Sequence, residues 1–239
     1  LAILGGGLAG GLTALALLRR QPDLRATLIE AGPRLGGEHT WSFHDGDLSA
    51  EGMALVEPLI THRWNFQQVK FPAHERRLSS GYNSIASSQF HEVMISSLGE
   101  RVRLNSPVAH ATPESVTLRS GEVLHAKAVL DCRGAAPSLH LKLGFQKFVG
   151  QEVRLAAPHG LDAPIIMDAT VPQLDGYRFI YVLPFSENTL LIEDTRYADG
   201  PDLPVDMFRQ EIADYAAAHG WSIEMVLREE EGVLPIALG

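Results

Sequence analysis

A glycine pattern near the start of the chain constrains the fold more than any other feature of this sequence. Gly5, Gly7 and Gly10 fit G-x-G-x-x-G, with an apolar run over 1–4 before them and apolar residues at helical spacing over 12–18 after them. In this setting the first glycine permits a tight turn, the second lets a pyrophosphate approach the backbone, and the third lets helix and strand pack closely. The pattern predicts a dinucleotide at the amino end of a helix. The alternative is a glycine-rich structural turn.

A second strand is expected over residues 26–30, and it ends in Glu30. Strand, glycine turn, helix and strand make a βαβ unit, which implies a parallel sheet. An acidic residue ~20 residues after the glycines is placed to bind a ribose hydroxyl. Glu30 therefore favours FAD or NAD over NADP as the tightly bound ligand.

Two further features favour FAD. Gly36 and Gly37 resemble the paired glycines that let many flavoprotein chains pass close to the cofactor. An apolar strand over 128–130 leads into Asp131 and Gly134, which resemble a later strand end of the same class. Taken singly, these residues could be a surface turn and a capping carboxylate. The ordered set is the stronger argument.

Composition excludes several classes of protein. Lys and Arg number 20 against 29 Asp and Glu, for a net charge of −9, whereas a phosphate-tracking nucleic-acid binder needs a basic face. One cysteine predicts a reducing compartment, the cytoplasm. The ten histidines show no metal-ligand spacing. No apolar run reaches the ~18–20 residues of a membrane span. Because the chain opens on an apolar strand without Met, we expect a fragment.

The rest of the chain shows two kinds of sequence pattern, one irregular and one rich in expected strands. We interpret them as parts of one interleaved structure. Residues 32–82 look irregular, with scattered aromatics such as Trp41, Phe43 and Trp64 that could line an apolar channel or simply pack in a core. The elements expected after them are a helix over 88–98, strands over 102–104, 115–118 and 123–126, strands over 148–155, 164–169, 178–183 and 189–193, and a helix over 205–218.

Three carboxylates are candidates for acid chemistry. Glu193 and Asp194 are expected at the end of an apolar strand, and Asp168 at the end of another. Adjacent strand residues point to opposite faces, so Glu193 and Asp194 cannot both face one site unless the strand bends. A carboxyl in an apolar pocket has a raised pKa and can serve as a general acid. Solvated carboxylates at a strand end are the commoner outcome.

Several motifs together resemble one family, the bacterial lycopene beta-cyclases, over essentially the whole chain. The matching segments are 39–44, 145–155, 164–170, 176–181, and 183–186 leading into 192–195. The resemblance implies that the chain lacks the family's N-terminal start and its C-terminal part, including a glycine-rich segment that returns to the flavin.

The resemblance also implies a fold class and two domains with separate roles. The fold would be α/β, with an FAD-binding Rossmann-like parallel sheet (the GR2 type of flavoprotein) and an interleaved, mostly antiparallel β-rich substrate domain. The FAD domain would comprise residues 1–60 and 84–140 and continue beyond 239. The substrate domain would comprise residues 61–83 and 141–239.

The activity implied is lycopene beta-cyclase, an isomerase that forms beta-ionone rings and gives gamma- and then beta-carotene. The acyclic end group is protonated, closes through a carbocation and loses a proton, with reduced FAD, with NADPH as the reductant and with no net redox change. Glu193 matches the family's acidic motif, and Asp194 and Asp168 are weaker candidates. Lycopene dissolves only in lipid, so the enzyme would work peripherally at the cytoplasmic membrane. The alternative is an FAD-dependent monooxygenase or prenyl-chain reductase of the same fold.

Overall fold

The computed structural model describes residues 1–134, 140–174 and 176–238 and divides the chain into two compact units. The first unit comprises Leu1–Ser42, Asp47–Thr61 and Ser84–Ala136. The second comprises Phe43–Gly46, His62–Asn83 and Pro137–Gly239. The expected change of domain after residue 140 adjoins residues 135–139, which lie outside the described residues. Residues 43–46 belong to the second unit, although the expected range 1–60 includes them.

A four-stranded parallel sheet of order β12-β1-β2-β8 forms the centre of the first unit. Its strands are β1 (Ala2–Leu4), β2 (Thr27–Ile29), β8 (Val102–Arg103) and β12 (Val129–Asp131). The helices of this unit are α1 (Leu8–Arg20), α2 (Ala50–Val56) and α3 (Ser87–Leu98). α1 and α3 pack closely because Gly11 leaves room for the ring of Phe90, with which a Cβ at Gly11 would collide. The predicted βαβ unit is confirmed.

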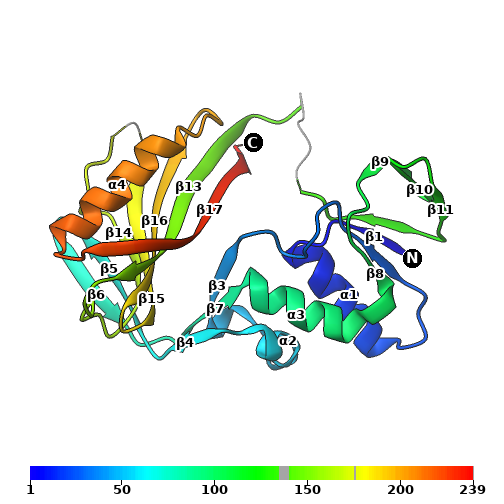
Figure 1. The fold of residues 1–239 in the computed structure, drawn as a ribbon, viewed down its shortest axis with the longest axis horizontal. Coiled ribbons are helices and arrows are strands. Elements are labelled where there is room, and N and C mark those ends of the chain that lie inside the picture. The colour runs from blue at the N-terminus through cyan, green and yellow to red at the C-terminus, as the bar shows by residue number, and fades with distance from the viewer. Residues whose placement is uncertain (135–139, 175, 239) are drawn as a thin grey trace. The chain divides into compact units, whose positions relative to one another are not determined.

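A small antiparallel sheet covers part of the parallel one (Figure 1). Its strands are β9 (Val108–Thr112), β10 (Ser115–Leu118) and β11 (Val123–His125), in the order β11-β10-β9. Val116 and Leu118 of β10 pack with Ala2, Leu4 and Ile29 of the parallel sheet in one apolar cluster. The strand β9 was not expected from the sequence.

A seven-stranded sheet of order β17-β13-β16-β15-β14-β5-β6 dominates the second unit. Its strands are β5 (Gln67–Phe71), β6 (His74–Leu78), β13 (Leu143–Leu155), β14 (Ile165–Asp168), β15 (Arg178–Ser186), β16 (Thr189–Ala198) and β17 (Ile223–Ala237). Every pairing is antiparallel except β14 with β5. A parallel sheet with a mostly antiparallel β-rich part confirms the expected α/β fold class.

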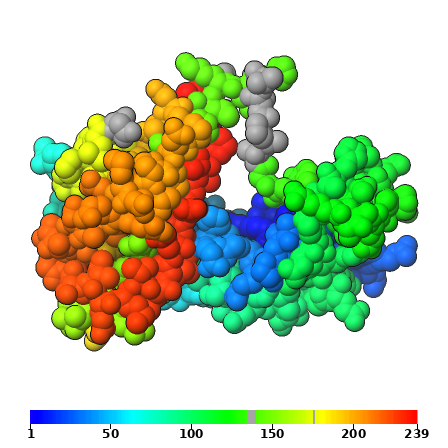
Figure 2. Space-filling model, turned by 45° about the horizontal axis from the view of Figure 1, so that its top comes forward, coloured from blue at the N-terminus to red at the C-terminus, as the bar shows by residue number. Residues whose placement is uncertain are grey.

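Different side chains pack on the two faces of the seven-stranded sheet. Helix α4 (Val205–Ala218) lies across one face (Figure 1), where Phe208 and Ile212 pack on Ile180 and Ile192 in a fully buried core. The outer side of α4, drawn in orange, is at the surface beside β17, drawn in red (Figure 2). The opposite face carries a separate cluster that includes Leu183 and Leu191.

Part of the expected element pattern is wrong. The helix over 205–218 is confirmed at those bounds, but residues 32–82 are not irregular. They contain β5, β6, α2, and the strands β3 (Thr40–His44) and β4 (His62–Trp64), which form a fourth sheet with β7 (Tyr82–Ala86) in the order β3-β7-β4. These strands are short, so their polar and apolar residues show no sustained period. Among the described residues, no helix is long and apolar enough to cross a bilayer.

Candidate functional site

The glycine turn between β1 and α1 has the geometry expected of a phosphate site. Gly5 has φ of +92°, and a Cβ there would lie 2.7 Å from the carbonyl oxygen of Cys132. A Cβ at Gly10 would collide with the carbonyl oxygen of Gly5, so the turn and the helix are in direct contact. Apart from its two chain neighbours, no residue lies within 4 Å of the Cβ position of Gly7. The residues present therefore fit a pyrophosphate, which could approach at Gly7.

The amino end of α1 also suits an anion. Gly7 is the N-cap residue, no side chain caps the helix, and the first turn contains no acidic residue. The first N–H groups of a helix and its dipole attract negative charge, and here no side chain competes for them. The turn lies at the carboxyl ends of parallel strands, where ligands bind in open α/β sheets.

Glu30 is fixed beside this turn by two backbone amides. Its two carboxylate oxygens accept hydrogen bonds from the N–H of Gly6 and of Gly32, each at 2.7 Å. Each oxygen has a further lone pair for a ribose hydroxyl. Gly36, with φ of +82°, donates its N–H to the carbonyl oxygen of Gly6 at 2.9 Å, so this glycine also lies at the turn. Gly37 follows with φ of +59°.

Asp131 ends β12 and pairs in register with Leu4 of β1. Its carboxylate accepts from Nε of Arg133 at 2.8 Å and from a terminal guanidinium nitrogen of that arginine at 2.6 Å, which lowers the pKa of Asp131 to about 2. Gly134 has φ of +95° and no neighbour at its Cβ position. The structure therefore brings Gly5, Glu30 and Asp131 to one edge of the parallel sheet, where β1, β2 and β12 end.

Glu193 lies in the middle of β16, and the expectation that it ends a strand is wrong. The strand continues to Ala198, because residues 194–198 pair with β13 and residues 194–196 also pair with β15. The residues in register with Glu193 are Tyr181 on β15 and Gly150 on β13, and Gly150 is in register with Glu230 on β17. These four residues form a row across the sheet, which we call the acid row. All four side-chain positions lie on one face.

The surroundings of Glu193 favour its protonated form. Burial removes water from the carboxyl and, with the nearby carboxyl of Glu230, raises the pKa of Glu193 to about 8. Thr195, two residues along the same face, donates its hydroxyl to Oε1 of Glu193 at 2.6 Å, which lowers the pKa by a smaller amount. A carboxyl that keeps its proton at neutral pH can act as a general acid.

Aromatic and aliphatic side chains lie on the same face of the sheet. Tyr82, Leu183 and Leu191 are buried, and Trp64, Ile166, Tyr181 and Phe185 pack against them. The hydroxyls of Tyr82 and Tyr181 are 2.8 Å apart, and Tyr181 is the neighbour of Glu193 in the acid row. Of the three aromatics singled out from the sequence, Trp64 is in this cluster. Trp41 packs instead on Phe90, with ring centroids 5.2 Å apart.

Asp194 points to the opposite face, under α4, because side chains alternate along β16. It is fully buried and ion-paired with Arg178 at 2.9 Å and Arg196 at 2.8 Å. Arg178 also bridges to Glu211 of α4 at 2.9 Å, and Arg196 lies over the ring of Phe208. These contacts connect the helix to the sheet.

Asp168 is at the end of β14, as expected, and also belongs to the α4 side. One of its oxygens accepts from the Tyr215 hydroxyl of α4 at 2.8 Å. The other accepts from the hydroxyl of Thr170 at 2.6 Å. The structure therefore does not bring Asp168 and Asp194 together with Glu193.

The other members of this site were not predicted from the sequence; they are Gly150, Glu230, Thr195 and Tyr181. What identifies them as members of the site is their position relative to Glu193 in the folded sheet, and pairing between distant strands is not visible in one sequence. The acidic run 229–231 was the available hint.

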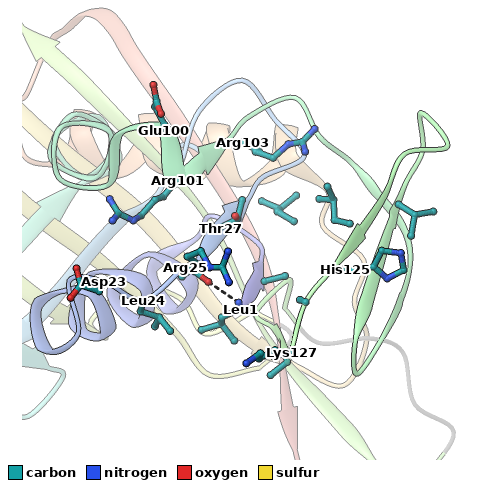
Figure 3. A pocket seen from close by; sticks show the side chains of 17 residues that line it. Leu1, Asp23, Leu24, Arg25, Thr27, Glu100, Arg101, Arg103, His125 and Lys127 are labelled. Atoms are coloured by element: carbon teal, nitrogen blue, oxygen red, sulfur yellow. Dashed lines mark hydrogen bonds between the residues drawn. The ribbon is translucent and has the colours of Figure 1, made fainter.

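A cavity of about 1200 Å³ lies in the first unit (Figure 3), and no residue of the glycine turn lines it. Residues that line it include Ala2, Thr27 and Ala128, at the amino ends of β1, β2 and β12. Basic side chains such as Arg25, Arg101 and Lys127 surround it. None of the sequence-predicted site residues lines this cavity. The part of the chain that the structure describes holds no group of three side chains suited to a metal ion.

Comparison with known proteins identifies relatives over the whole chain. The family model described as "Lycopene cyclase protein" matches residues 1–239. The lycopene beta-cyclase of Pantoea ananas is 50% identical over 238 residues, which are 100% of this chain and 62% of that protein. The lycopene beta-cyclase of Paracoccus sp. is 50% identical over 236 residues, which are 98% of this chain and 60% of that protein. The chain spans about three fifths of the length of these relatives.

Solved structures with the same fold are more distant in sequence. A geranylgeranyl bacteriochlorophyll reductase-like protein of Thermoplasma acidophilum matches with a TM-score of 0.67 at 14% identity, covering 100% of this chain and 66% of that one. The tetrameric form of 2-methyl-3-hydroxypyridine-5-carboxylic acid oxygenase matches with a TM-score of 0.64 at 18% identity, covering 100% and 71%. At such identity these matches establish the fold alone.

Proposed function

Because the chain belongs to the lycopene cyclase family, we propose that the protein of which it forms part is a lycopene beta-cyclase. The substrate is an acyclic carotenoid end group, and the product is a beta-ionone ring formed without net redox change. The observation that carries the proposal is Glu193, whose pKa is raised to about 8 on a sheet face with aromatic side chains. An alkene is a weak base and requires an acid that keeps its proton in a dry site.

The first unit would hold FAD. The turn at Gly5, Gly7 and Gly10 would accept the pyrophosphate, and Glu30 would accept the hydroxyls of the adenosine ribose. Gly36, Gly37, Asp131 and Gly134 would lie along the cofactor. The flavin would act in its reduced form, with NADPH as the reductant.

The second unit would supply the acid and the substrate surface. Glu193 protonates the terminal double bond, the resulting carbocation closes to a six-membered ring, and the ring loses a proton. Tyr181, its neighbour in the acid row, and the Tyr82 beside it present aromatic rings, whose faces attract a cation. Leu183 and Leu191 contribute apolar surface to the same cluster, which suits a hydrocarbon without polar groups.

Asp194 and Asp168 have a structural role in this proposal. Both carboxylates are engaged with residues that attach α4 to the sheet, on the face opposite Glu193. Removing either carboxylate would weaken the fold of the second unit. It would affect Glu193 only through that loss of stability.

The substrate dissolves in lipid, so we propose that the protein works at the cytoplasmic face of the membrane. A net charge of −9 gives anionic lipid little electrostatic attraction. Contact through apolar side chains is therefore the proposed mode of docking.

The test is incubation of the full-length protein with lycopene, FAD and NADPH, followed by chromatographic identification of the carotenoids. We expect gamma-carotene first and beta-carotene later. The variant Glu193→Gln should retain FAD and lose cyclisation. The control is Glu231→Gln, which makes the same change at an exposed position of β17. Lycopene that remains unchanged beside bound, reduced flavin would refute the proposal.

The same incubation separates a cyclase from a monooxygenase or a prenyl-chain reductase. Those activities consume NADPH in proportion to product, whereas a cyclase needs it only to reduce the flavin. Measuring NADPH oxidised per ring formed therefore decides between them.

A further inference from the structure

The acid row contains a second carboxyl that the proposed reaction has not used. Glu230 of β17 is only 3% exposed, although glutamate is rarely buried without a partner. Its side chain and that of Glu193 approach each other over Gly150. A Cβ built on Gly150 would lie 3.3 Å from Oε1 of Glu230 and 3.4 Å from Cβ of Glu193. The missing side chain at Gly150 therefore lets two carboxyls share one hollow.

The two carboxyls have different neighbours. Arg228, two residues before Glu230 on the same face, approaches Oε2 of Glu230 at 3.2 Å. Glu193 has the neutral hydroxyl of Thr195 at 2.6 Å. An adjacent cation favours the charged form of a carboxyl, and two carboxylates in one site disfavour double ionisation. The arrangement therefore places the negative charge on Glu230 and the proton on Glu193.

We propose that Glu230 is the positioning residue of the acid site: its carboxylate, held by Arg228, keeps the proton on Glu193. This inference rests on the proposed function only for the use made of that proton. Pairs of carboxyls whose environments differ in this way divide acid and anion roles in other enzymes.

Other titratable groups around Glu193 do not replace Glu230. Glu152 on β13 faces Arg228 at 3.3 Å and interacts with His62, whose pKa is lowered mainly by burial. Tyr181 is hydrogen-bonded to the Tyr82 hydroxyl. Asp194 raises the pKa of Glu193 less than Glu230 does. It lies on the other face with its arginines.

The test compares Glu230→Gln with Glu231→Gln in the full-length protein. The first reading is the infrared band of the protonated Glu193 carboxyl, identified by its absence in Glu193→Gln and followed from pH 5 to pH 9. We expect its titration midpoint to fall by about one pH unit or more in Glu230→Gln and to stay in place in Glu231→Gln. The alkaline limb of the pH profile of cyclisation should move by the same amount, which is about tenfold in rate per unit above the new midpoint.

Glu230→Asp keeps the carboxylate but shortens the side chain by one methylene, which moves the charge away from Glu193. This variant provides the measurement if Glu230→Gln does not fold. Its midpoint should lie between those of the wild type and Glu230→Gln. A midpoint in both Glu230 variants equal to that of the wild type would overturn the inference. Failure of the proposed function is distinguishable, because the infrared titration does not depend on cyclisation.

Discussion

Replacing Glu193 with Gln should change how the stability of the protein depends on pH. In the folded chain the pKa of this carboxyl is raised from an ordinary value of 4.5 to about 8, chiefly by burial and by the nearby Glu230. Between these values the folded state holds a proton that the unfolded state has released. The free energy of unfolding of the wild type therefore falls, relative to the glutamine variant, as pH rises through this interval.

The size of the effect follows from the two pKa values. Each unit of difference corresponds to about 1.4 kcal/mol at 25 °C. The interval from 4.5 to about 8 therefore corresponds to a loss of about 5 kcal/mol. A loss of this size is a large part of the 5–15 kcal/mol by which proteins are usually stable. Glutamine has a similar shape and does not titrate, so Glu193→Gln removes the dependence without leaving a cavity.

Urea unfolding at constant ionic strength, at pH 5, 6, 7, 8 and 9, measures the effect. As the pH rises, the unfolding midpoint of the wild type should fall relative to that of Glu193→Gln. The variant should therefore gain stability over the wild type between pH 5 and pH 9. Glu231→Gln is the control, because Glu231 is exposed and should leave the wild-type dependence unchanged. If the difference between wild type and Glu193→Gln is the same at pH 5 and pH 9, Glu193 does not titrate in this range and is not the acid described above.

Three further predictions concern the turn, the ion pairs and the hollow. Gly10→Ala should weaken FAD binding at least tenfold, because its Cβ would collide with the carbonyl of Gly5; flavin absorbance after gel filtration measures this. Asp194→Asn should lower the free energy of unfolding by about 3–5 kcal/mol, because it breaks a buried ion pair with Arg178; urea unfolding checks it, and an unchanged midpoint would contradict the structural assignment. Gly150→Ala should reduce cyclisation while FAD content stays constant, because the new Cβ would lie 3.1 Å from Cγ of Glu230 and fill the hollow between the two carboxyls. Carotenoid analysis together with a flavin spectrum measures both quantities.

Local patterns explain why the βαβ unit and its glycine turn were predictable. Gly5, Gly7 and Gly10 need only their immediate neighbours to define the turn, and the helical spacing that follows needs no distant partner. The α4 helix was equally clear, because its buried side recurs at Phe208, Ile212 and Tyr215. Such signals depend on one element at a time.

The strand β17 shows why the rest was not predictable. It pairs with β13 over most of its length but has an exposed edge, and its residues alternate poorly between apolar and polar. The run of Glu229, Glu230 and Glu231 reads as a solvated acidic stretch. Only the tertiary structure shows that Glu230 is buried while Glu231 is exposed. The residue that we propose to keep the proton on Glu193 was therefore hidden in a sequence of ordinary surface character.

The alternation of β16 explains how one strand can carry both an acid and a structural anion. Glu193 and Asp194 are adjacent, but their side chains enter different environments because the strand period is two residues. On the α4 face, two arginines hold Asp194 in place. On the other face Arg228 contacts Glu230 and Glu152, and Glu193 accepts a hydrogen bond from the hydroxyl of Thr195. The chemistry of the two carboxyls is therefore decided by which face of the sheet the arginines of β15, β16 and β17 occupy, since the two side chains differ by a single methylene.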